Sequence, residues 1–150
     1  MHEGAAELAV VIPGKPIAKA RPRFFRRGKF VGTYKAQGQD TAEGRFLVYM
    51  TGQISLSEPL RGPVSVSCGF YMPRPKAHYG TGKNARILKN SAPKRHAKKP
   101  DLDNLIKFVL DCLNMSGVWT DDNQVYKIES HKVYSSKPRT EIIIKHGGGL

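Results

Sequence analysis

Acidic residues gather in one part of this 150-residue chain, directly after a long stretch that holds only basic charges. Five of the twelve acids fall between residues 101 and 122, and four of them form two pairs, Asp101 with Asp103 and Asp121 with Asp122. Carboxylate oxygens are the ligands that Mg²⁺ prefers, and Mg²⁺ keeps waters that a substrate phosphate can replace. The grouping therefore indicates an all-oxygen metal site, with two carboxylates from a helix start and one or two from a later turn.

A cation in such a site would serve phosphodiester chemistry. One or two ions can polarise a scissile phosphate, orient a water and lower its pKa, and stabilise the leaving 3′ oxygen. Lys107 lies one helical turn after Asp103, a spacing that lets its ammonium reach the phosphate or the developing charge. Acids and lysine together indicate metal-assisted cleavage of a nucleic acid.

Simpler structural roles for the same residues stay open at this point. Asp101 alone is typical of a helix N-cap. Asp103, Lys107 and Asp111 also form an i, i+4 ladder, in which each solvated pair is worth only about 0.3–0.5 kcal/mol. The run Asp121-Asp122-Asn123 is typical of a turn. Two aspartates separated by one residue do not by themselves distinguish a metal ligand from a cap.

The helix that would carry the first pair is the clearest element in the sequence. It is predicted over residues 102–114, where one apolar stripe recurs at steps of three and four residues. Asp101 stands at its N-cap position, and Asn114 with Gly117 supplies a stop. The stripe consists of Leu102, Leu105, Ile106, Val109, Leu110 and Leu113.

The remaining elements predict an α+β fold, a small mixed sheet with helices packed on one face. Alternating and short apolar runs predict strands, and a weak 3.6-residue period predicts a second helix. The last two strands flank a turn at residues 135–138, so we expect them to pair as a hairpin. The predicted order is a strand at 8–13, a loop and ragged hairpin through Arg27-Gly28, a helix at 36–54, and strands at 63–72, 124–134 and 139–145.

Net charge identifies the kind of partner. A charge of +13 with a pI near 10.0 favours a polyanion, either nucleic acid or an anionic membrane surface. Residues 15–39 hold eight Lys and Arg, residues 73–100 hold nine, and neither tract holds an acid. Together they contain 17 of the 25 basic residues. A protein that only binds phosphates gains nothing from acids beside its bases, whereas one that holds a cation beside phosphates needs them.

Five cations are the predicted DNA contacts. Lys19, Arg21 and Arg23 alternate with single uncharged residues, so an extended segment would present all three along one edge. Lys98 and Lys99 close the second tract immediately before the acids. As a set, the basic residues predict that log K falls with log salt at a slope of about −0.9 per neutralised phosphate. Six further cations of the second tract are weaker candidates for DNA contacts, because a solvated surface role fits each of them at least as well: Arg74, Lys76, Lys83, Arg86, Lys94 and Arg95.

The second basic tract has an unusual form. Residues 73–100 show little apolar periodicity, and a structureless loop of this length in a compact domain is usually functional or disordered. Its basic composition favours a flexible nucleic-acid-binding flap that orders on contact.

Length and composition limit the remaining possibilities. The chain is long enough for one domain, spanning residues 1–150, and too short to favour two. Its apolar runs are too short to cross a membrane, and its N-terminus lacks the pattern of a secretory signal. Cys68 and Cys112 have neither metal-site spacing nor disulfide density, so we expect buried free thiols. These features predict a cytoplasmic protein.

Several motifs resemble one nuclease family. The run PDLDNLIK and the later W-x-DD-x-Q-V, between Pro100 and Val125, are similar to the RusA family of Holliday junction resolvases. The N-terminal IPGKPIAKARPRF, a later K-x-Y and PRTEI also resemble phage-type members. The similarity runs in order over roughly residues 10–145, and the central motifs recur together at matching separations.

The resemblance implies a homodimeric endodeoxyribonuclease that resolves four-way DNA junctions by paired symmetric nicks, in recombination and repair. Its cofactor would be Mg²⁺, with Mn²⁺ as a substitute. Asp101, Asp103 and Asp122 would be the metal ligands and Lys107 the catalytic lysine. Asn104 would be a supporting polar group, and Asp121 a supporting acid beside the third ligand. The basic loop before the motif is longer than in compact members, which leaves open the branched structure that the protein prefers.

Two other functions compete with a junction resolvase. A non-catalytic nucleic-acid-binding protein would use its acids only to cap a helix and shape a turn, and would bind DNA without nicking it. A metal nuclease of broader preference would also cut flaps, replication forks or single strands. Comparing junction, flap and linear substrates separates these possibilities.

Overall fold

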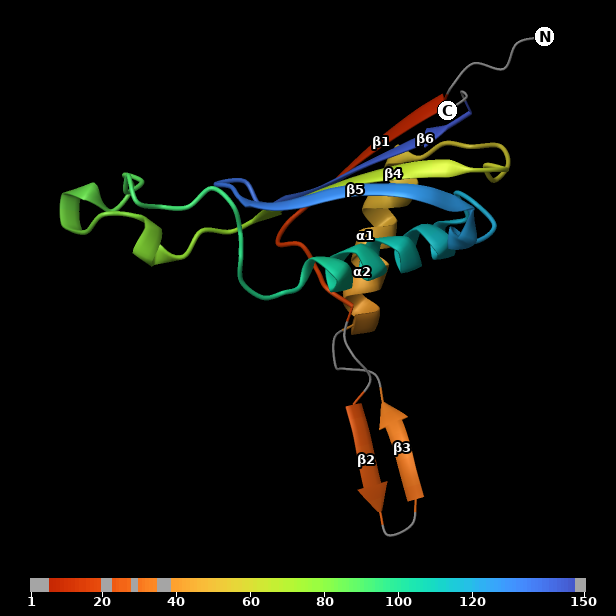
Figure 1. The fold of residues 1–150 in the computed structure, drawn as a ribbon, viewed down its shortest axis with the longest axis horizontal. Coiled ribbons are helices and arrows are strands. Elements are labelled where there is room, and N and C mark those ends of the chain that lie inside the picture. Colours follow the sequence, from red (N-terminus) through yellow and green to blue (C-terminus); the bar gives the residue numbers. More distant parts are fainter. Residues whose placement is uncertain (1–5, 20–22, 28–29, 35–38, 148–150) are drawn as a thin grey trace.

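A computed structural model describes most of the chain (Figure 1). The described backbone covers residues 6–19, 23–27, 30–34 and 39–147, with side chains described for residues 6–19 and 41–147.

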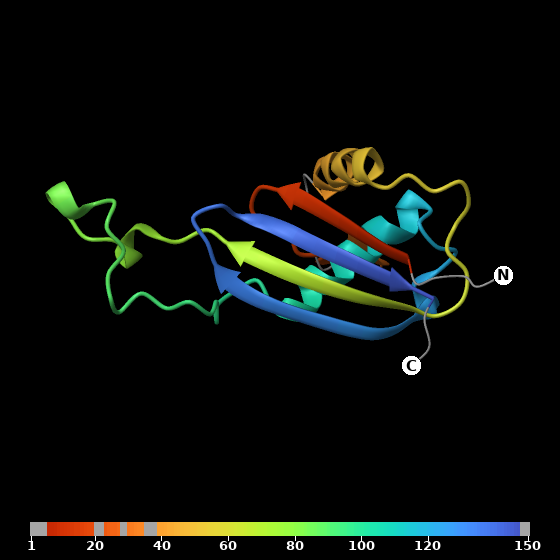
Figure 2. The same cartoon turned by 90° about the horizontal axis from the view of Figure 1, so that it is seen from above.

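A four-stranded sheet in the order β1-β6-β4-β5 forms the centre of the fold (Figure 2). β5 runs parallel to β4, whereas β6 runs antiparallel to both β4 and β1. The predicted mixed sheet is therefore confirmed. Its strands are β1 (Ala6–Pro13), β4 (Val64–Met72), β5 (Val125–Tyr134) and β6 (Arg139–His146).

Two helices, α1 (Gln39–Gln53) and α2 (Leu102–Ser116), cover one face of this sheet (Figures 1 and 2). They contact each other through Phe46 and Phe108, whose rings meet edge to face with centroids 5.3 Å apart. The apolar stripe of α2 is buried or half-buried against the sheet. The expected α+β architecture, with helices on one face, is confirmed.

The expected hairpin between the last two strands is wrong, because β4 lies between them. Phe70 of β4 pairs with Lys132 of β5 on one side and with Thr140 of β6 on the other. The linker 135–138 crosses the end of β4, where the Ser135 amide donates to the Met72 carbonyl at 2.9 Å. Two strand spacings amount to about 10 Å, a distance that four extended residues can span. A short linker therefore did not require the two strands to pair directly.

A separate two-stranded hairpin precedes α1. β2 (Arg23–Arg27) pairs antiparallel with β3 (Phe30–Tyr34), with Arg27 opposite Phe30. The predicted hairpin is confirmed in its two strands, while Gly28 lies outside the described residues.

The core lies between the sheet and the helices, and both cysteines belong to it. Every second residue of β4 from Val64 to Met72 is buried toward the helices, as alternation predicts for a strand with one covered face. Cys68 and Cys112 are buried free thiols, which confirms the expectation from the sequence. Burial raises the pKa of each thiol to about 12, so both stay protonated at neutral pH.

Residues 73–100, called the arm from here on, leave the end of β4 and project beyond the sheet (Figure 2). The arm contains two short 3-10 turns, η1 (Lys76–His78) and η2 (Gly82–Asn84). Tyr79 forms an antiparallel bridge with Leu88, and the Lys89 amide donates to the His78 carbonyl at 2.8 Å. The arm is therefore locally folded rather than structureless.

No helix among the described residues has the length and apolar character needed to cross a membrane.

Gly117 ends α2 in the left-handed region at φ 77°, where its amide donates to the Asn114 carbonyl. We expect Gly117→Ala to lower the free energy of unfolding by about 1–2 kcal/mol, because a Cβ disfavours this conformation. Gly117→Asn should cost less, because Asn tolerates it. Urea denaturation measures both.

Gly44→Ala is the matched control, because Gly44 lies inside α1 and a Cβ there meets no atom within 4 Å. It should stabilise the protein by about 0.5–1 kcal/mol. Equal effects of the two alanine substitutions would contradict the assignment of Gly117 as the helix C-cap.

Candidate active site

Asp101 occupies the N-cap position of α2 but does not cap the helix with its side chain. Its backbone is extended (φ −68°, ψ 144°), and the Leu105 amide donates to its carbonyl at 3.2 Å, which begins the helix. The carboxylate accepts no capping hydrogen bond and is exposed. The simple explanation that Asp101 is present for capping therefore loses its main support, and its oxygens are available to a cation.

The i, i+4 ladder that the sequence left open as a simpler role for these residues is also absent among the described side chains. Asp103 and Lys107 are exposed, and neither forms an ion pair with another described side chain. One oxygen of Asp103 accepts from the Asn104 amide at 2.9 Å. Asp111, the third member, instead binds Lys19, with Nζ and Oδ2 2.8 Å apart. Asp103 and Lys107 thus remain open to solvent one turn apart.

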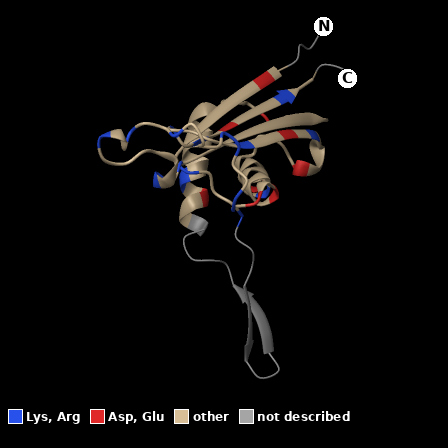
Figure 3. Cartoon of the chain, turned by 60° about the vertical axis from the view of Figure 1, so that its left-hand side comes forward, with Lys and Arg blue, Asp and Glu red and all other residues tan. Residues whose placement is uncertain are grey.

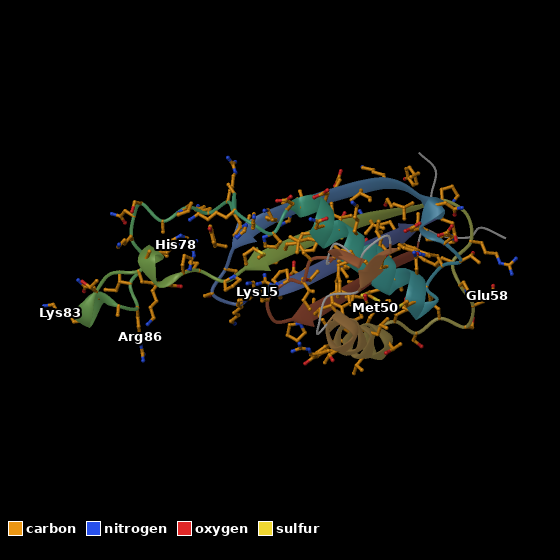
Figure 4. All side chains as sticks on the ribbon, turned by 90° about the horizontal axis from the view of Figure 1, so that it is seen from below. Lys15, Met50, Glu58, His78, Lys83 and Arg86 are labelled. Atoms are coloured by element: carbon orange, nitrogen blue, oxygen red, sulfur yellow. The ribbon has the colours of Figure 1, made fainter. Side chains whose placement is uncertain are left out.

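A cleft of about 690 Å³ opens beside Asp101 at the start of α2. Two lysines reach it from different parts of the chain: Lys15 from the loop after β1, and Lys99 from the end of the arm. Lys15 lies toward the end of the sheet from which the arm leaves (Figure 4). A cleft that combines a carboxylate with two ammonium groups can hold a phosphate next to a cation. Its lining consists of Lys15, Pro16, Ala18, Lys99, Pro100, Asp101 and Asn104.

Asp121 and Asp122 lie at the other end of α2, around the 3-10 turn η3 (Asp122–Gln124). Asp121 caps this turn: its Oδ1 accepts from the Asp122 amide at 2.8 Å, and Gln124 completes a capping box. Asp122 Oδ2 accepts from Asn114 Nδ2 at 3.2 Å. Asn114 also accepts from the buried Trp119 indole at 2.6 Å. Much of the W-x-DD-x-Q-V motif therefore builds the turn that follows α2.

The structure does not bring the three predicted ligands together within one chain. Asp122 is bonded to Asn114, which lies eleven residues after Asp103 on the same helix. At 1.5 Å per residue the two positions are about 16 Å apart along the axis. Consistently, the described part of the chain contains no group of three or more His, Cys, Asp or Glu that could hold a metal. The sequence predicted the helix between these acids, but the predicted metal site left out the distance that a straight helix keeps between its two ends.

The five predicted DNA contacts have different surroundings. Lys19 is engaged by carboxylates, at 2.8 Å from Asp111 and 3.8 Å from Glu43, and its amide donates to the Asn104 carbonyl. Lys98 and Lys99 are exposed. Arg21 lies outside the described residues, and only the backbone of Arg23 is described, within β2. Lys19 thus serves to fasten the segment after β1 to α2.

The arm is anchored to the sheet around the ring of Tyr134. The Arg74 guanidinium lies 5.3 Å from the ring centroid, and the rings of His78 and His96 contact it with centroids 4.6 and 4.9 Å away. Burial, helped by neighbouring cations, holds the pKa of both histidines below its ordinary value. Neutral histidines therefore belong to this packing, and lysines and arginines follow the arm outward (Figure 3).

Two comparisons with known proteins agree with this picture. The family model described as "Endodeoxyribonuclease RusA" matches residues 13–145. The chain is also 35% identical over 140 residues to "Uncharacterized protein YqaN" of Bacillus subtilis (strain 168), covering 88% of this chain and 91% of that protein. The chain therefore belongs to the RusA family of endodeoxyribonucleases, which confirms the resemblance seen in its motifs. Membership implies an enzyme that cuts DNA.

The surroundings of Lys19 and Lys99 predict different effects on DNA binding. Lys99→Met should weaken binding and reduce the slope of log K against log salt by about 0.9, as expected for one lost phosphate contact. Lys19→Met should leave that slope unchanged and lower thermal stability instead, because its ammonium binds carboxylates. A salt titration of binding to a labelled junction, without divalent metal, measures both. If Lys19→Met and Lys99→Met change the slope of log K against log salt equally, Lys19 contacts DNA as the sequence predicted.

Proposed function

We propose that this protein is a metal-dependent endonuclease that resolves four-way DNA junctions by paired symmetric nicks, acting in the cytoplasm in recombination and repair. The observation that carries the proposal is the uncapped Asp101 carboxylate, in a cleft with Lys15 and Lys99, in a chain of the RusA family. We propose Mg²⁺ as the cofactor, with Mn²⁺ able to substitute.

The residues at the start of α2 suit a hard cation. Asp101 and Asp103 offer exposed carboxylate oxygens, and no ion pair competes for them among the described side chains. The bound ion would polarise the scissile phosphate and favour an attacking hydroxide. Lys15 and Lys99 would hold the phosphate in the cleft, and the exposed Lys107 would stabilise charge that develops on it. Asn104, which also lines the cleft, would orient the substrate by hydrogen bonding.

A second copy of the chain can supply what one chain lacks. The two edges of the sheet differ: on β1, Gln53 bonds both the amide and the carbonyl of Val11 at 2.8 Å. On β5 the arm covers only the last residues, where Arg95 bridges Val133. Within the described residues nothing pairs with the outer edge of residues 125–131. An open edge of this length is a template for pairing with another strand.

The sequence of this edge is complementary to itself. Lys127 and Glu129 form an ion pair at 3.1 Å within one chain. If two copies pair antiparallel about Ile128, Lys127 of one also lies opposite Glu129 of the partner subunit, and the reverse pair follows by symmetry. Tyr126 and Ile128 are 55% and 40% exposed, and such a contact would cover them. We therefore propose a homodimer with a two-fold axis near Ile128.

This dimer would complete the metal site. Asp122 precedes β5, whereas the other end of β5 is fastened beside Asp101, since Lys132 binds the Pro100 carbonyl. Reversing one β5 against another would carry Asp122 of each subunit toward Asp101 and Asp103 of its partner. Two such sites related by a two-fold axis would match the two strands cut in a junction. The arm, along which Figure 3 shows basic residues, would then lie against the flanking DNA.

Asp103→Asn should reduce the rate of junction cleavage by more than about a hundredfold, because it removes a charge that holds the metal. Junction binding without metal should persist. The measurement is nicking of labelled four-way junction, flap and linear duplex, with and without Mg²⁺. Glu7→Gln is the control, at an exposed carboxylate on β1, the edge strand on the opposite side of the sheet from β5. Binding without nicking by the unaltered protein would indicate a binding protein, and equal cutting of all substrates a broader nuclease.

Mixing two inactive variants tests the shared site. In a heterodimer of Asp103→Asn with Asp122→Asn, both changes fall in one site and the other site is intact. An equal mixture, refolded together, should therefore regain about a quarter of the normal sites, all of them in heterodimers that nick one strand. If all ligands came from one subunit, the mixture would stay inactive.

A further inference from the structure

Lys132 holds the entrance to α2 in place from the edge strand β5. Its Nζ donates to the Lys98 carbonyl at 2.7 Å and to the Pro100 carbonyl at 2.8 Å. These two carbonyls flank Lys99, and the second belongs to the residue directly before Asp101. We infer that Lys132 is a positioning residue, which sets the places of Asp101 and Lys99 in the cleft. The importance of those places for cleavage rests on the proposed function.

The side chain of Lys132 continues an attachment that the backbone cannot complete. The end of the arm lies along β5, where the His96 amide donates to the Lys132 carbonyl and the Tyr134 amide donates to the Lys94 carbonyl. Pro100 has no amide hydrogen with which to continue such a ladder. The Lys132 ammonium instead binds the Pro100 carbonyl, four residues after His96, where the last backbone hydrogen bond to β5 is made. One residue therefore fastens the segment twice, through its main chain and through its side chain.

The bonds made by Lys132 are suited to fixing a position. Hydrogen bonds from an ammonium to carbonyls are stronger than bonds between neutral groups. The side chain is half-buried on β5, which pairs with the central strand β4 through Phe70. The rigid sheet thereby fixes the position of the Pro100 carbonyl. The next residue, Asp101, accepts the first hydrogen bond of α2 from the Leu105 amide. Groups that orient metal ligands in this way typically matter 10- to 100-fold for affinity or activity.

Direct contact with DNA is the competing role for a lysine at this place. Two of the three N–H bonds of the ammonium are directed to carbonyls of the same chain. A phosphate contact would predict weaker DNA binding on removal of the side chain. A positioning role predicts an unchanged salt slope of binding, because Lys99 keeps its charge, together with slower cleavage and a loosened start of α2.

The test compares Lys132→Met, which removes the donor, with Lys132→Arg, which keeps a cation able to donate to both carbonyls. Lys145→Met is the matched control, because Lys145 is an exposed lysine at the far end of β6 with the same charge and length. Amide hydrogen exchange without metal or DNA is the first measurement. In Lys132→Met we expect exchange at Leu105 to rise by about tenfold or more, while exchange at Gly117, at the other end of α2, stays unchanged.

Cleavage and binding are measured on the same proteins. Lys132→Met should cut at saturating enzyme about tenfold more slowly or worse, with the metal-free Kd for the junction within about twofold of normal and an unchanged salt slope. Lys132→Arg should restore most of the Leu105 protection and of the cleavage rate. Lys145→Met should behave as the unaltered protein in both measurements.

Normal Leu105 exchange in Lys132→Met would overturn the inference, as would weakened binding with unaltered exchange. If Lys132→Met fails to fold, Lys132→Arg is compared with Lys132→Gln instead. Equal loss of Leu105 protection in these two variants would also overturn the inference. The exchange result does not depend on cleavage. A protein that cuts no DNA but loses Leu105 protection would reject the proposed function and retain the positioning role.

Discussion

Helix α2 is a rigid spacer of 15 residues, about 22 Å long, and the arrangement of the site depends on that length. Its apolar stripe is buried against the sheet, so the helix cannot bend to bring its ends together. Asp101 and Asp103 stand at one end, and Asp122 is bonded to Asn114 at the other. A single chain therefore offers two separate acidic positions, and a site that uses all three carboxylates requires a second chain.

The two edges of the sheet explain where that second chain would pair. Gln53 uses its side-chain amide to satisfy the backbone of β1, and the arm satisfies the end of β5. Among the described residues, the first part of β5 keeps unpaired backbone groups on its outer edge and exposed apolar side chains. Lys127 and Glu129, which pair with each other at 3.1 Å within one chain, also have the spacing that antiparallel self-pairing needs. The edge that is open is thus the one that would carry Asp122 toward the start of a neighbouring α2.

The arm shows how composition and structure give complementary information. Its basic composition and lack of periodicity indicated a nucleic-acid contact but not a shape. The shape depends on residues of β5, which are distant in the sequence. The side chains of Arg74, His78 and His96 pack around the ring of Tyr134, and Lys132 binds the backbone at the end of the arm. The arm therefore leads directly into the cleft at Asp101, and Lys99 lines that cleft because of how the arm is attached.

The local sequence pattern was sufficient to predict α2, the bounds of the sheet strands within a few residues, the mixed sheet with helices on one face, and the family. These features depend on periodicity, caps and short motifs, which are properties of neighbouring residues. The local pattern was insufficient for the placing of β4 between β5 and β6, and for the roles of Lys15, Lys19 and Lys132. The sequence by itself determined which residue types are available for metal and phosphate chemistry. Only the tertiary structure decided which of them meet, because strand order, helix length and long-range hydrogen bonds set distances that spacing along the chain does not contain.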